Sequence, residues 1–473
     1  GGPRSAACAA IRVGRAAAAA MFWCKAQSES RRVKARRRIS SDLRPGNSVG
    51  EFLLQPSNES KESLDSALTD APRGLGGVLL ESKFLSALLL AVPAGVAARW
   101  TDQADAVVFS TNFLGIIPLA WLIGKCTEDL ATVTGEVAGG LLNATFGNVV
   151  EMLLCIASIR SGQLTITKCT LLGSILSNLL LVMGCSCLFG GIFGLQDGER
   201  TQKFTEAGAN VQVVMLLLAV LCLGLPTAYA DTMEDVDQDF SWEVLVMSRY
   251  LAVLLLVAYF LYLYFQIVSH PELFGEEDDG GDEADMAPGC ATAVLALCTV
   301  MCTVSTEYLI GSIQGTLESF NLTKEFVGVI LLPIIGNAAE HYTAITVALG
   351  DKMDLALGVA VGSSCQMALL VAPFTVLVGW WYDQKMSLDF HSFQMFVLLG
   401  SVLVVASVLW SRQTHWLYGA MMIVAYVAVA IVYFCESGNA SVFHDRPAHF
   451  QRPSSGPAAL PPHAAPPGAP RHV

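Results

Sequence analysis

The stretch Gly147-Asn148-Val149-Val150-Glu151 decides the fold, because its pattern returns as Gly336-Asn337-Ala338-Ala339-Glu340. Each copy lies inside an apolar run long enough for a membrane-spanning helix, which needs about 20 residues. A glutamate near the middle of such a span costs about 2.5–3.5 kcal/mol even on the translocon scale. Two glutamates placed at this cost indicate groups that have a function inside the membrane.

The two stretches belong to a longer internal repeat. Gly173-Ser174 follows the first stretch and Gly362-Ser363 the second, each 26 residues after the leading glycine (173 − 147 and 362 − 336). The halves are therefore offset by 189 residues (336 − 147). Polar residues three positions apart share one face of a helix. Such pairs are Asn148 and Glu151, Asn337 and Glu340, Ser174 and Ser177, and Ser363 and Gln366.

Small residues crowd the same stretches, which lets helix backbones approach and leaves carbonyl groups free for a ligand. Examples are Gly139, Gly140, Gly328 and Ala338. Duplicated halves whose polar, glycine-interrupted helices meet near the middle of the membrane are typical of secondary transporters.

These residues resemble the calcium/proton exchangers of the calcium/cation antiporter superfamily. The matching text is Gly-Gly-Leu-Leu-Asn-Ala-Thr-Phe-Gly-Asn-Val-Val-Glu at 139–151, Gly-Asn-Ala-Ala-Glu-His at 336–341 and Gly-Val-Ala-Val-Gly-Ser-Ser-Cys-Gln at 358–366. The resemblance covers about residues 75–435. It implies one leading helix followed by two inverted repeats of five helices each.

Composition also indicates an integral membrane protein. Of the 473 residues 53% are hydrophobic and only 15% are charged, which is too apolar for an ordinary soluble protein. Most of the 13 cysteines lie inside apolar runs, so we expect buried free thiols rather than a disulfide framework. The cysteines so placed are Cys155, Cys169, Cys185, Cys187, Cys222, Cys298, Cys302, Cys365 and Cys435.

The chain is predicted to be an all-α polytopic membrane protein with about 11 transmembrane helices. The expected spans lie near 79–98, 105–124, 134–159, 166–192, 205–225, 245–268, 290–311, 326–349, 355–379, 390–410 and 415–435. The corresponding segments are a basic tail (1–74), the leading helix with the first repeat (75–268), an acidic linker (269–289), the second repeat (290–435) and a C-terminal tail (436–473).

The three polar segments have distinct compositions. Residues 31–38 hold six positive charges, and the arginine-rich, acid-poor start is compatible with a transit-peptide remnant or a truncated gene model. In relatives of plant type this tail can regulate transport. The stretch 272–285 has eight acids and no base, which fits a solvated linker or, by resemblance, a cation-attracting segment. The Pro- and His-rich C-terminal tail is predicted to be disordered.

The basic N-terminal tail predicts a cytosolic N-terminus by the positive-inside rule. An odd number of spans then places the acidic linker in the cytosol and the C-terminus on the other side. The short loops carry five positive charges on each side, so they do not decide the orientation. The resemblance implies a vacuolar or other acidic organelle membrane.

The chemistry of the repeated residues suits a hard divalent cation, because Ca²⁺ takes six to eight oxygen ligands. Glu151 and Glu340 would neutralise one Ca²⁺, while neutral oxygens could come from Asn148, Asn337, Ser174, Ser177, Ser363 and Gln366. Without the ion, desolvation and mutual repulsion would prevent both carboxylates from staying ionised. Protons would then replace the metal, and this competition is an antiporter mechanism in outline.

Two further residues are candidates for supporting roles. His341 follows Glu340 and has Met152 at its repeat position, so it is either a satisfied core histidine or a group that handles protons or ion selection. Glu307 matches a recurrent glutamate of the family and is an accessory candidate. Gly311 stands where the family pattern leads us to expect an aspartate or another polar residue.

The leading interpretation is a Ca²⁺/H⁺ antiporter, not an enzyme, with Ca²⁺ and H⁺ as transported ions and no cofactor. Alternatives are an exchanger that prefers Mn²⁺ or uses Na⁺, and a cation channel. The sequence has no His-Glu-x-x-His zinc motif, no Gly-x-Ser-x-Gly elbow in a span and no phosphate-binding loop to power a pump. We expect the lipid bilayer and no nucleic acid as a partner, and the sequence leaves the oligomeric state open.

The span count gives a topology prediction. A tag inserted after Gly2 should be accessible from the cytosol and one after Pro470 only from the opposite side, because eleven spans place the ends in different compartments. Protease protection of sealed vesicles measures this. Finding both tags on the same side would show that one span has been miscounted.

Overall fold

The computed structural model describes residues 74–194, 201–233, 241–271 and 284–438. The predicted N-terminal and C-terminal tails and nearly all of the acidic stretch lie outside these residues.

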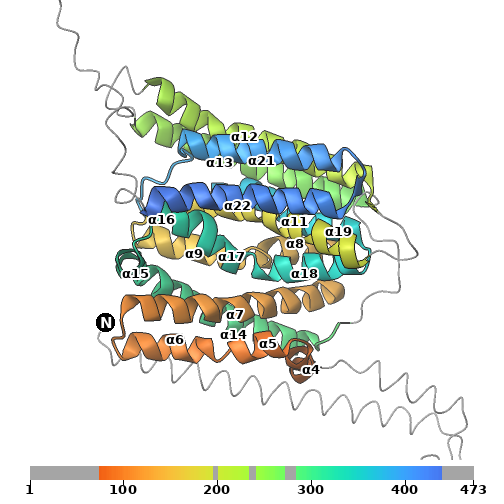
Figure 1. Ribbon diagram of the computed structural model, residues 1–473, viewed down its shortest axis with the longest axis horizontal. Helices are drawn as coiled ribbons and strands as arrows, with labels where there is room; N and C mark the ends of the chain where they lie inside the picture. Colours follow the sequence, from red (N-terminus) through yellow and green to blue (C-terminus); the bar gives the residue numbers. More distant parts are fainter. Residues whose placement is uncertain (1–73, 195–200, 234–240, 272–283, 439–473) are drawn as a thin grey trace, which may run out of the picture.

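The described chain is a bundle of long helices that run roughly side by side (Figure 1). The α-helices are α4 (Gly74–Glu81), α5 (Lys83–Leu88), α6 (Ala91–Trp100), α7 (Asp105–Thr134), α8 (Glu136–Phe146), α9 (Val149–Arg160), α10 (Leu164–Leu176), α11 (Met183–Phe189), α12 (Glu206–Met233), α13 (Ser241–Tyr264), α14 (Pro288–Gly311), α15 (Ile313–Phe320), α16 (Lys324–Phe326), α17 (Leu332–Gly336), α18 (Ala338–Leu349), α19 (Met353–Gln366), α20 (Ala372–Trp381), α21 (Ser392–Leu409) and α22 (Trp416–Gly438). The π-helical segments are η1 (Ser177–Val182), η2 (Gly190–Gly194), η3 (Phe265–Ser269), η5 (Val327–Leu331) and η6 (Met367–Val371).

The all-α polytopic class is confirmed. Within the described ranges, nine helices are long and apolar enough to cross a membrane, and two bent helix pairs raise the number to as many as eleven. The strands in these ranges are β1 (Gln202–Lys203) and β2 (Gln413–Thr414), which pair antiparallel between two connecting loops.

Three expected spans are not continuous helices. The first is divided among α4, α5 and α6, and the third is the pair α8 and α9, bent by 45°. The eighth is divided among α16, η5, α17 and α18. Helix α15 precedes it and ends at Asn321, whose left-handed backbone conformation reverses the chain, so that 324–336 lies at 113° to α15.

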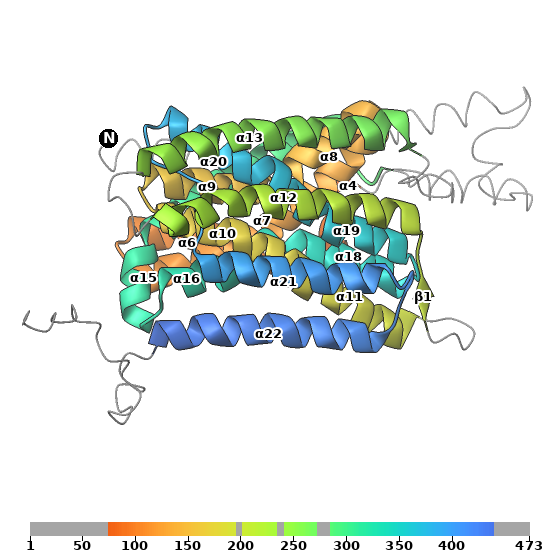
Figure 2. The ribbon, with the colours of Figure 1, turned by 90° about the horizontal axis from the view of Figure 1, so that it is seen from above.

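The bundle has two ends, which we name by the elements there. The α15 end holds α15, the connection between α6 and α7, and the connection between α20 and α21. The β1 end holds β1 and the connection between α18 and α19 (Figure 2). The polar breaks in the helices lie between these ends.

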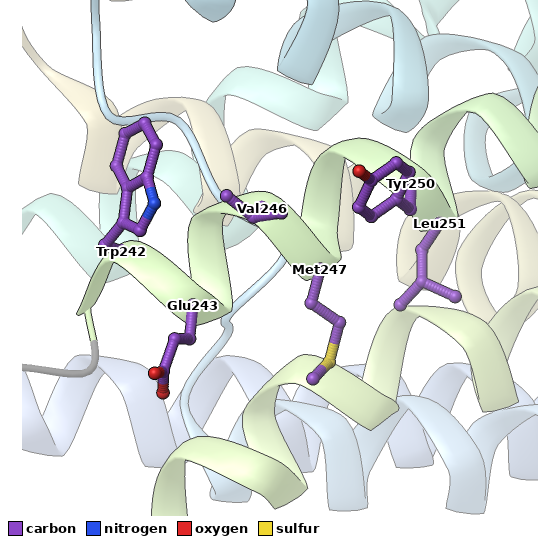
Figure 3. A pocket seen from close by; sticks show the side chains of 6 residues that line it. All are labelled: Trp242, Glu243, Val246, Met247, Tyr250 and Leu251. Atoms are coloured by element: carbon purple, nitrogen blue, oxygen red, sulfur yellow. The ribbon is translucent and has the colours of Figure 1, made fainter.

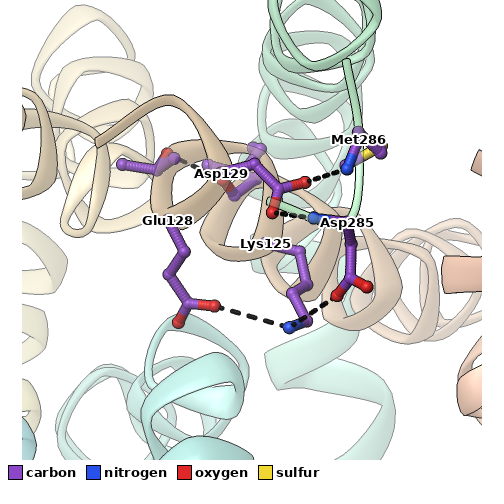
Figure 4. Close-up of polar contacts among 7 residues, drawn as sticks. Lys125, Glu128, Asp129, Asp285 and Met286 are labelled. Carbon is purple, nitrogen blue, oxygen red and sulfur yellow. Dashed lines mark hydrogen bonds and ion pairs between the residues drawn. The ribbon is translucent and has the colours of Figure 1, made fainter. Parts of the chain in front are cut away.

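The two halves are tied together at the β1 end, where α7 stops and α14 begins (Figure 4). The buried carboxylate of Asp129 accepts hydrogen bonds from the backbone N–H groups of Asp285 and Met286, each at 3.0 Å. The Lys125 ammonium lies 3.5 Å from Asp285 and 3.8 Å from Glu128. Asp129 thus satisfies backbone donors just before α14 and fixes the first helix of the second half against α7.

The nine cysteines named above are free, as expected. Seven of them are buried, Cys185 is half-buried, and Cys435 is exposed near the end of α22. The expectation of burial was therefore wrong for Cys435, because the last helix turns much of its surface away from the protein.

Equivalent glycines of the two halves differ in their surroundings. A Cβ on Gly173 would lie 2.3 Å from the backbone oxygen of Val329, so α10 packs with its backbone directly on η5. A Cβ on Gly362 would meet only the Gln212 side chain, at 3.4 Å. The two repeats are therefore packed unequally although their sequences correspond.

This difference predicts unequal effects of one substitution. Gly173→Ala should destabilise the protein by about 1–3 kcal/mol, because the methyl group forces two backbones apart. Gly362→Ala is the matched control and should change stability little. Thermal unfolding of the purified variants in detergent measures both, and equal losses of stability would contradict the packing difference.

Candidate functional site

Glu151 lies in the first turn of α9, directly after the break in the third span. Its side chain is 1% exposed, and neither carboxylate oxygen has a hydrogen-bond partner. The chain makes room for it with Gly336 of the second half, where a Cβ would lie 2.8 Å from Oε1. The start of α9, with its positive helix-dipole end, partly offsets the negative charge.

Glu340 has the corresponding place in the second half, in the first turn of α18 after the break at Asn337. Its Oε2 is buried without a partner, but the residue as a whole is only half-buried. Gly336, which approaches the Glu151 carboxylate, lies four residues before Glu340, about one helical turn away (340 − 336), so both glutamates belong to the same region of the bundle. No donor among the described residues contacts these three buried carboxylate oxygens, and buried polar atoms without a partner are rare in folded proteins.

Neutral polar groups connect the two halves around these glutamates. The Asn148 Nδ2 donates to Gln366 Oε1 at 2.5 Å, and the Ser363 hydroxyl lies 3.5 Å from Asn148 Oδ1. In the opposite direction, the Ser174 hydroxyl donates to Asn337 Oδ1 at 3.1 Å. Asn337 Nδ2 donates to the Ser174 backbone oxygen, also at 3.1 Å.

These contacts follow the repeat. Asn148 corresponds to Asn337 and Ser174 to Ser363, each at an offset of 189 (337 − 148 and 363 − 174). The contact from Asn148 to Ser363 is therefore the counterpart of the contact from Asn337 to Ser174. Each half supplies an asparagine that reaches a serine of the other half, as expected of repeats related by a pseudo-twofold axis.

The helices that carry the serines share an irregularity. Helix α10 passes into η1 at Ser177, and α19 passes into η6 after Gln366, the residue that corresponds to Ser177. π-Helical turns of this kind are frequent at functional sites, since they interrupt the regular backbone hydrogen bonds.

Sequence reasoning missed two polar residues next to the site. Asn178 is fully buried, donates to the Ser363 hydroxyl at 3.0 Å and keeps Oδ1 without a partner. Its repeat position is held by Met367, so the comparison of halves gave no signal for it. The buried hydroxyl of Tyr426, on α22, lies near Ser177.

His341 contacts the backbone of its own helix and borders a pocket. Its Nδ1 lies 2.8 Å from the Asn337 backbone oxygen, and because a carbonyl only accepts, Nδ1 carries the hydrogen. The side chain also lines a pocket of about 380 Å³ between α5, α7 and α18. The pocket-lining residues are Ser82, Phe84, Leu85, Ile117, Trp121, Ala338, His341, Tyr342 and Ile345.

Two charged residues of the spans form contacts elsewhere. Glu307 pairs with Arg160, the last residue of α9, and both side chains are about half exposed. The structure thus brings Glu307 to Arg160 near the α15 end and not into the group around Glu151. Lys168 of α10 donates to the Ser387 hydroxyl at 3.1 Å and to the Asp389 backbone oxygen. These two hydrogen bonds hold the loop between α20 and α21 against α10.

The sequence and the fold are similar to those of known proteins. The sodium/calcium exchanger protein family matches this chain over residues 105–268 and 290–435. The chain belongs to this family. The matched ranges contain both helix breaks, both glutamates and the serine-bearing helices.

Individual relatives cover most of the chain. The vacuolar cation/proton exchanger 3 of Oryza sativa subsp. japonica is 40% identical over 80% of this chain and 92% of its own length. The Ca²⁺/H⁺ antiporter of Aphanothece halophytica is 38% identical over 73% of this chain and 95% of its own length. The solved structure of the selenium-substituted Ca²⁺/H⁺ antiporter protein YfkE matches with a TM-score of 0.63 and 30% identity, over 75% of this chain and 99% of that one.

Proposed function

We propose that this protein is a secondary active Ca²⁺/H⁺ antiporter that moves Ca²⁺ out of the cytosol in exchange for protons, by alternating access around Glu151 and Glu340. The observation that carries the proposal is the set of buried carboxylate oxygens without donors, contributed by matching positions of both repeats. Relatives described as Ca²⁺/H⁺ antiporters and cation/proton exchangers support it.

Charge balance is the physical basis of the exchange. Two ionised carboxylates at mid-membrane repel each other and have lost their hydration, so the empty site is unfavourable unless they bind a dication or take up protons. Ca²⁺ and protons would therefore compete for the same oxygens. If only a neutralised site can reorient, the movement of one ion across the membrane requires the other to return.

The neutral side chains have oxygens that suit the ion. Ca²⁺ prefers six to eight oxygens from carboxylates, amides, hydroxyls, backbone carbonyls and water. Asn178 Oδ1 is buried and accepts no hydrogen bond from the described residues, so it could turn to a cation without breaking a protein contact. Ser177 Oγ is buried beside the Tyr426 hydroxyl and is a second candidate oxygen. Gln366 and Asn148 now satisfy each other and would have to separate if both were ligands.

The unequal packing of the repeats supports a conformation that is closed toward the α15 end. There α10 lies directly on η5, and Glu151 is shielded from solvent. Glu340 keeps accessible surface, and the neighbouring His341 faces the pocket beside α18. In the opposite conformation the looser contact at Gly362 would close and that at Gly173 would open.

His341 is the residue best placed to influence protons or ion choice. With Nδ1 donating to Asn337, its Nε2 is the nitrogen left to accept a proton or a metal ion. An exchanger that prefers Mn²⁺ is the second candidate, since imidazole nitrogen is a better ligand for transition metals than for Ca²⁺.

The proposed location is a vacuolar or other acidic organelle membrane, with a cytosolic N-terminus. The α15 end then faces the lumen and the β1 end the cytosol. Names of relatives such as the vacuolar exchangers of rice support the membrane, and the basic stretch at residues 31–38 supports the orientation.

Reconstituted protein tests the proposal. Acid-loaded proteoliposomes should take up ⁴⁵Ca²⁺, and collapse of the pH gradient should stop the uptake. Mn²⁺, Mg²⁺ and Na⁺ as competitors identify the preferred ion. Uptake that persists without the gradient would indicate a channel and contradict exchange.

The paired carboxylates give the first functional prediction. Glu151→Gln or Glu340→Gln removes one charge with little change of shape, so either should lower proton-driven Ca²⁺ uptake by at least roughly tenfold while the protein still folds. Glu318→Gln, at an exposed position of α15, is the matched control and should transport normally. Near-normal uptake by either of the first two variants would remove that glutamate from the site.

Gln366 gives the second functional prediction. A neutral amide can supply an oxygen or hold a neighbour but cannot carry the exchanged proton, so Gln366→Ala should raise the Ca²⁺ half-saturation or alter the Mn²⁺ preference while transport stays dependent on the pH gradient. Initial rates over a range of Ca²⁺ concentrations, normalised to folded protein, measure this. An unchanged half-saturation and ion preference would show that Gln366 only bridges helices.

A further inference from the structure

A cation is held between two indole rings on the outer side of the bundle. The Arg249 guanidinium carbon of α13 lies 5.7 Å from the centre of the Trp242 ring and 4.7 Å from that of Trp380 on α20. Helices α13 and α20 pack against each other. The sandwich of Arg249 between Trp242 and Trp380 therefore joins transmembrane helices of different repeats. Two rings fix the guanidinium in place, since each contributes a cation–π attraction.

This cation lacks an anion. Its Nε is buried without a hydrogen-bond partner, and among the described residues no carboxylate forms an ion pair with it. Glu243 precedes Arg249 on the same helix, but no ion pair joins the two side chains. An arginine held in an aromatic sandwich without a protein partner is suited to an external anion.

The sandwich lies where a bilayer interface is expected. Its neighbours are aromatic side chains that project outward at the α15 end of the bundle: Trp242 is 61% exposed, Trp380 53% and Trp381 85%. Tryptophan and tyrosine collect at the level of the lipid headgroups. The span Trp242–Ser269 has 28 residues and is about 42 Å long, which exceeds the roughly 30 Å hydrocarbon core. Arg249 lies about two helical turns after Trp242, so its long side chain can reach the bilayer interface.

A shallow, open and mostly apolar groove begins at the same tryptophan, and α13 alone supplies its lining residues (Figure 3). It has a volume of about 460 Å³ and lies along the outer face of α13. The lining residues are Trp242, Glu243, Val246, Met247, Tyr250 and Leu251. Apart from the Glu243 carboxylate, its walls are mostly hydrocarbon and aromatic, which suits an acyl chain and not a soluble ion.

We propose that Arg249, Trp242 and Trp380 bind the phosphate group of a glycerophospholipid whose acyl chain occupies the groove beside α13. Arginine donors match phosphate oxygens, and the charge-assisted hydrogen bonds strengthen at an interface of low dielectric constant. The lipid would join α13 of the first repeat to α20 of the second. This site is separate from Glu151 and Glu340 and does not depend on the transport reaction.

Native mass spectrometry of the purified protein in mild detergent tests the proposal, with a defined phosphatidylglycerol titrated in. Wild-type protein should retain a bound lipid, and Arg249→Gln should weaken lipid binding by roughly tenfold, about 1.4 kcal/mol. Arg99→Gln is the matched control, because Arg99 is an exposed arginine in the last turn of α6 at the same end of the bundle. Its lipid binding should equal that of wild type.

Two further experiments separate the contribution of the aromatic ring from that of the acyl chain. Trp380→Leu keeps an apolar side chain but removes one ring, and it should weaken binding without unfolding the protein, as size-exclusion profiles would show. Inorganic phosphate should not displace the lipid at equal concentration, because it has no acyl chain. The phospholipid site would be overturned if Arg249→Gln retained as much lipid as wild type. It would also be overturned if Arg99→Gln lost as much lipid as Arg249→Gln, or if inorganic phosphate displaced the lipid.

Discussion

The structure depends on one constraint: carboxylate oxygens of Glu151 and Glu340 are buried in a membrane-spanning bundle, and no described residue donates to them. Glu151 has two unpartnered oxygens and Glu340 has one. In a medium of low dielectric constant such an arrangement persists only if a cation or protons complete it. In the proposed exchanger, the helix breaks, the close approach at Gly336 and the amide and hydroxyl groups between the repeats would all serve this requirement.

The helix breaks convert a repeated sequence into a site. Asn148 and Asn337 each precede a new helix, and each reaches a residue of the other half instead of capping its own helix. Each of these contacts joins a residue of one half to a residue of the other half. Movement of one half relative to the other therefore changes the surroundings of both glutamates together. The unequal packing at Gly173 and Gly362 is consistent with the proposed exchange between two arrangements of the repeats.

Much of this arrangement could be predicted from the sequence, because the repeat fixes which polar residues correspond and the cost of burying them indicates function. Asn178 could not be found in this way, since its counterpart Met367 is apolar. Tyr426 lies on the last span, and only the packing of that helix brings its hydroxyl toward Ser177. Family resemblance identified Glu307, but it could not reveal that Arg160 pairs with it.

Most bounds of the spans were predictable to within a few residues, but α7 continues to Thr134 and α12 to Met233, well beyond the predicted ends at 124 and 225. The interruptions of the spans were not predictable. Hydropathy reports the length of an apolar run, and α4, α5 and α6 together present such a run although the helix is broken twice. The bend at Gly147 and the reversal at Asn321 depend on backbone conformations that apolar periodicity does not encode.

The central claim is that Ca²⁺ and protons compete for Glu151 and Glu340. The most direct measurement is the Ca²⁺ affinity of the purified protein in weakly buffered detergent solution at several pH values, together with the protons released on binding. The account predicts that affinity falls as the pH is lowered and that each bound Ca²⁺ releases protons, with the release lost in the Glu151→Gln, Glu340→Gln double variant. Ca²⁺ binding that is independent of pH and releases no protons would contradict it.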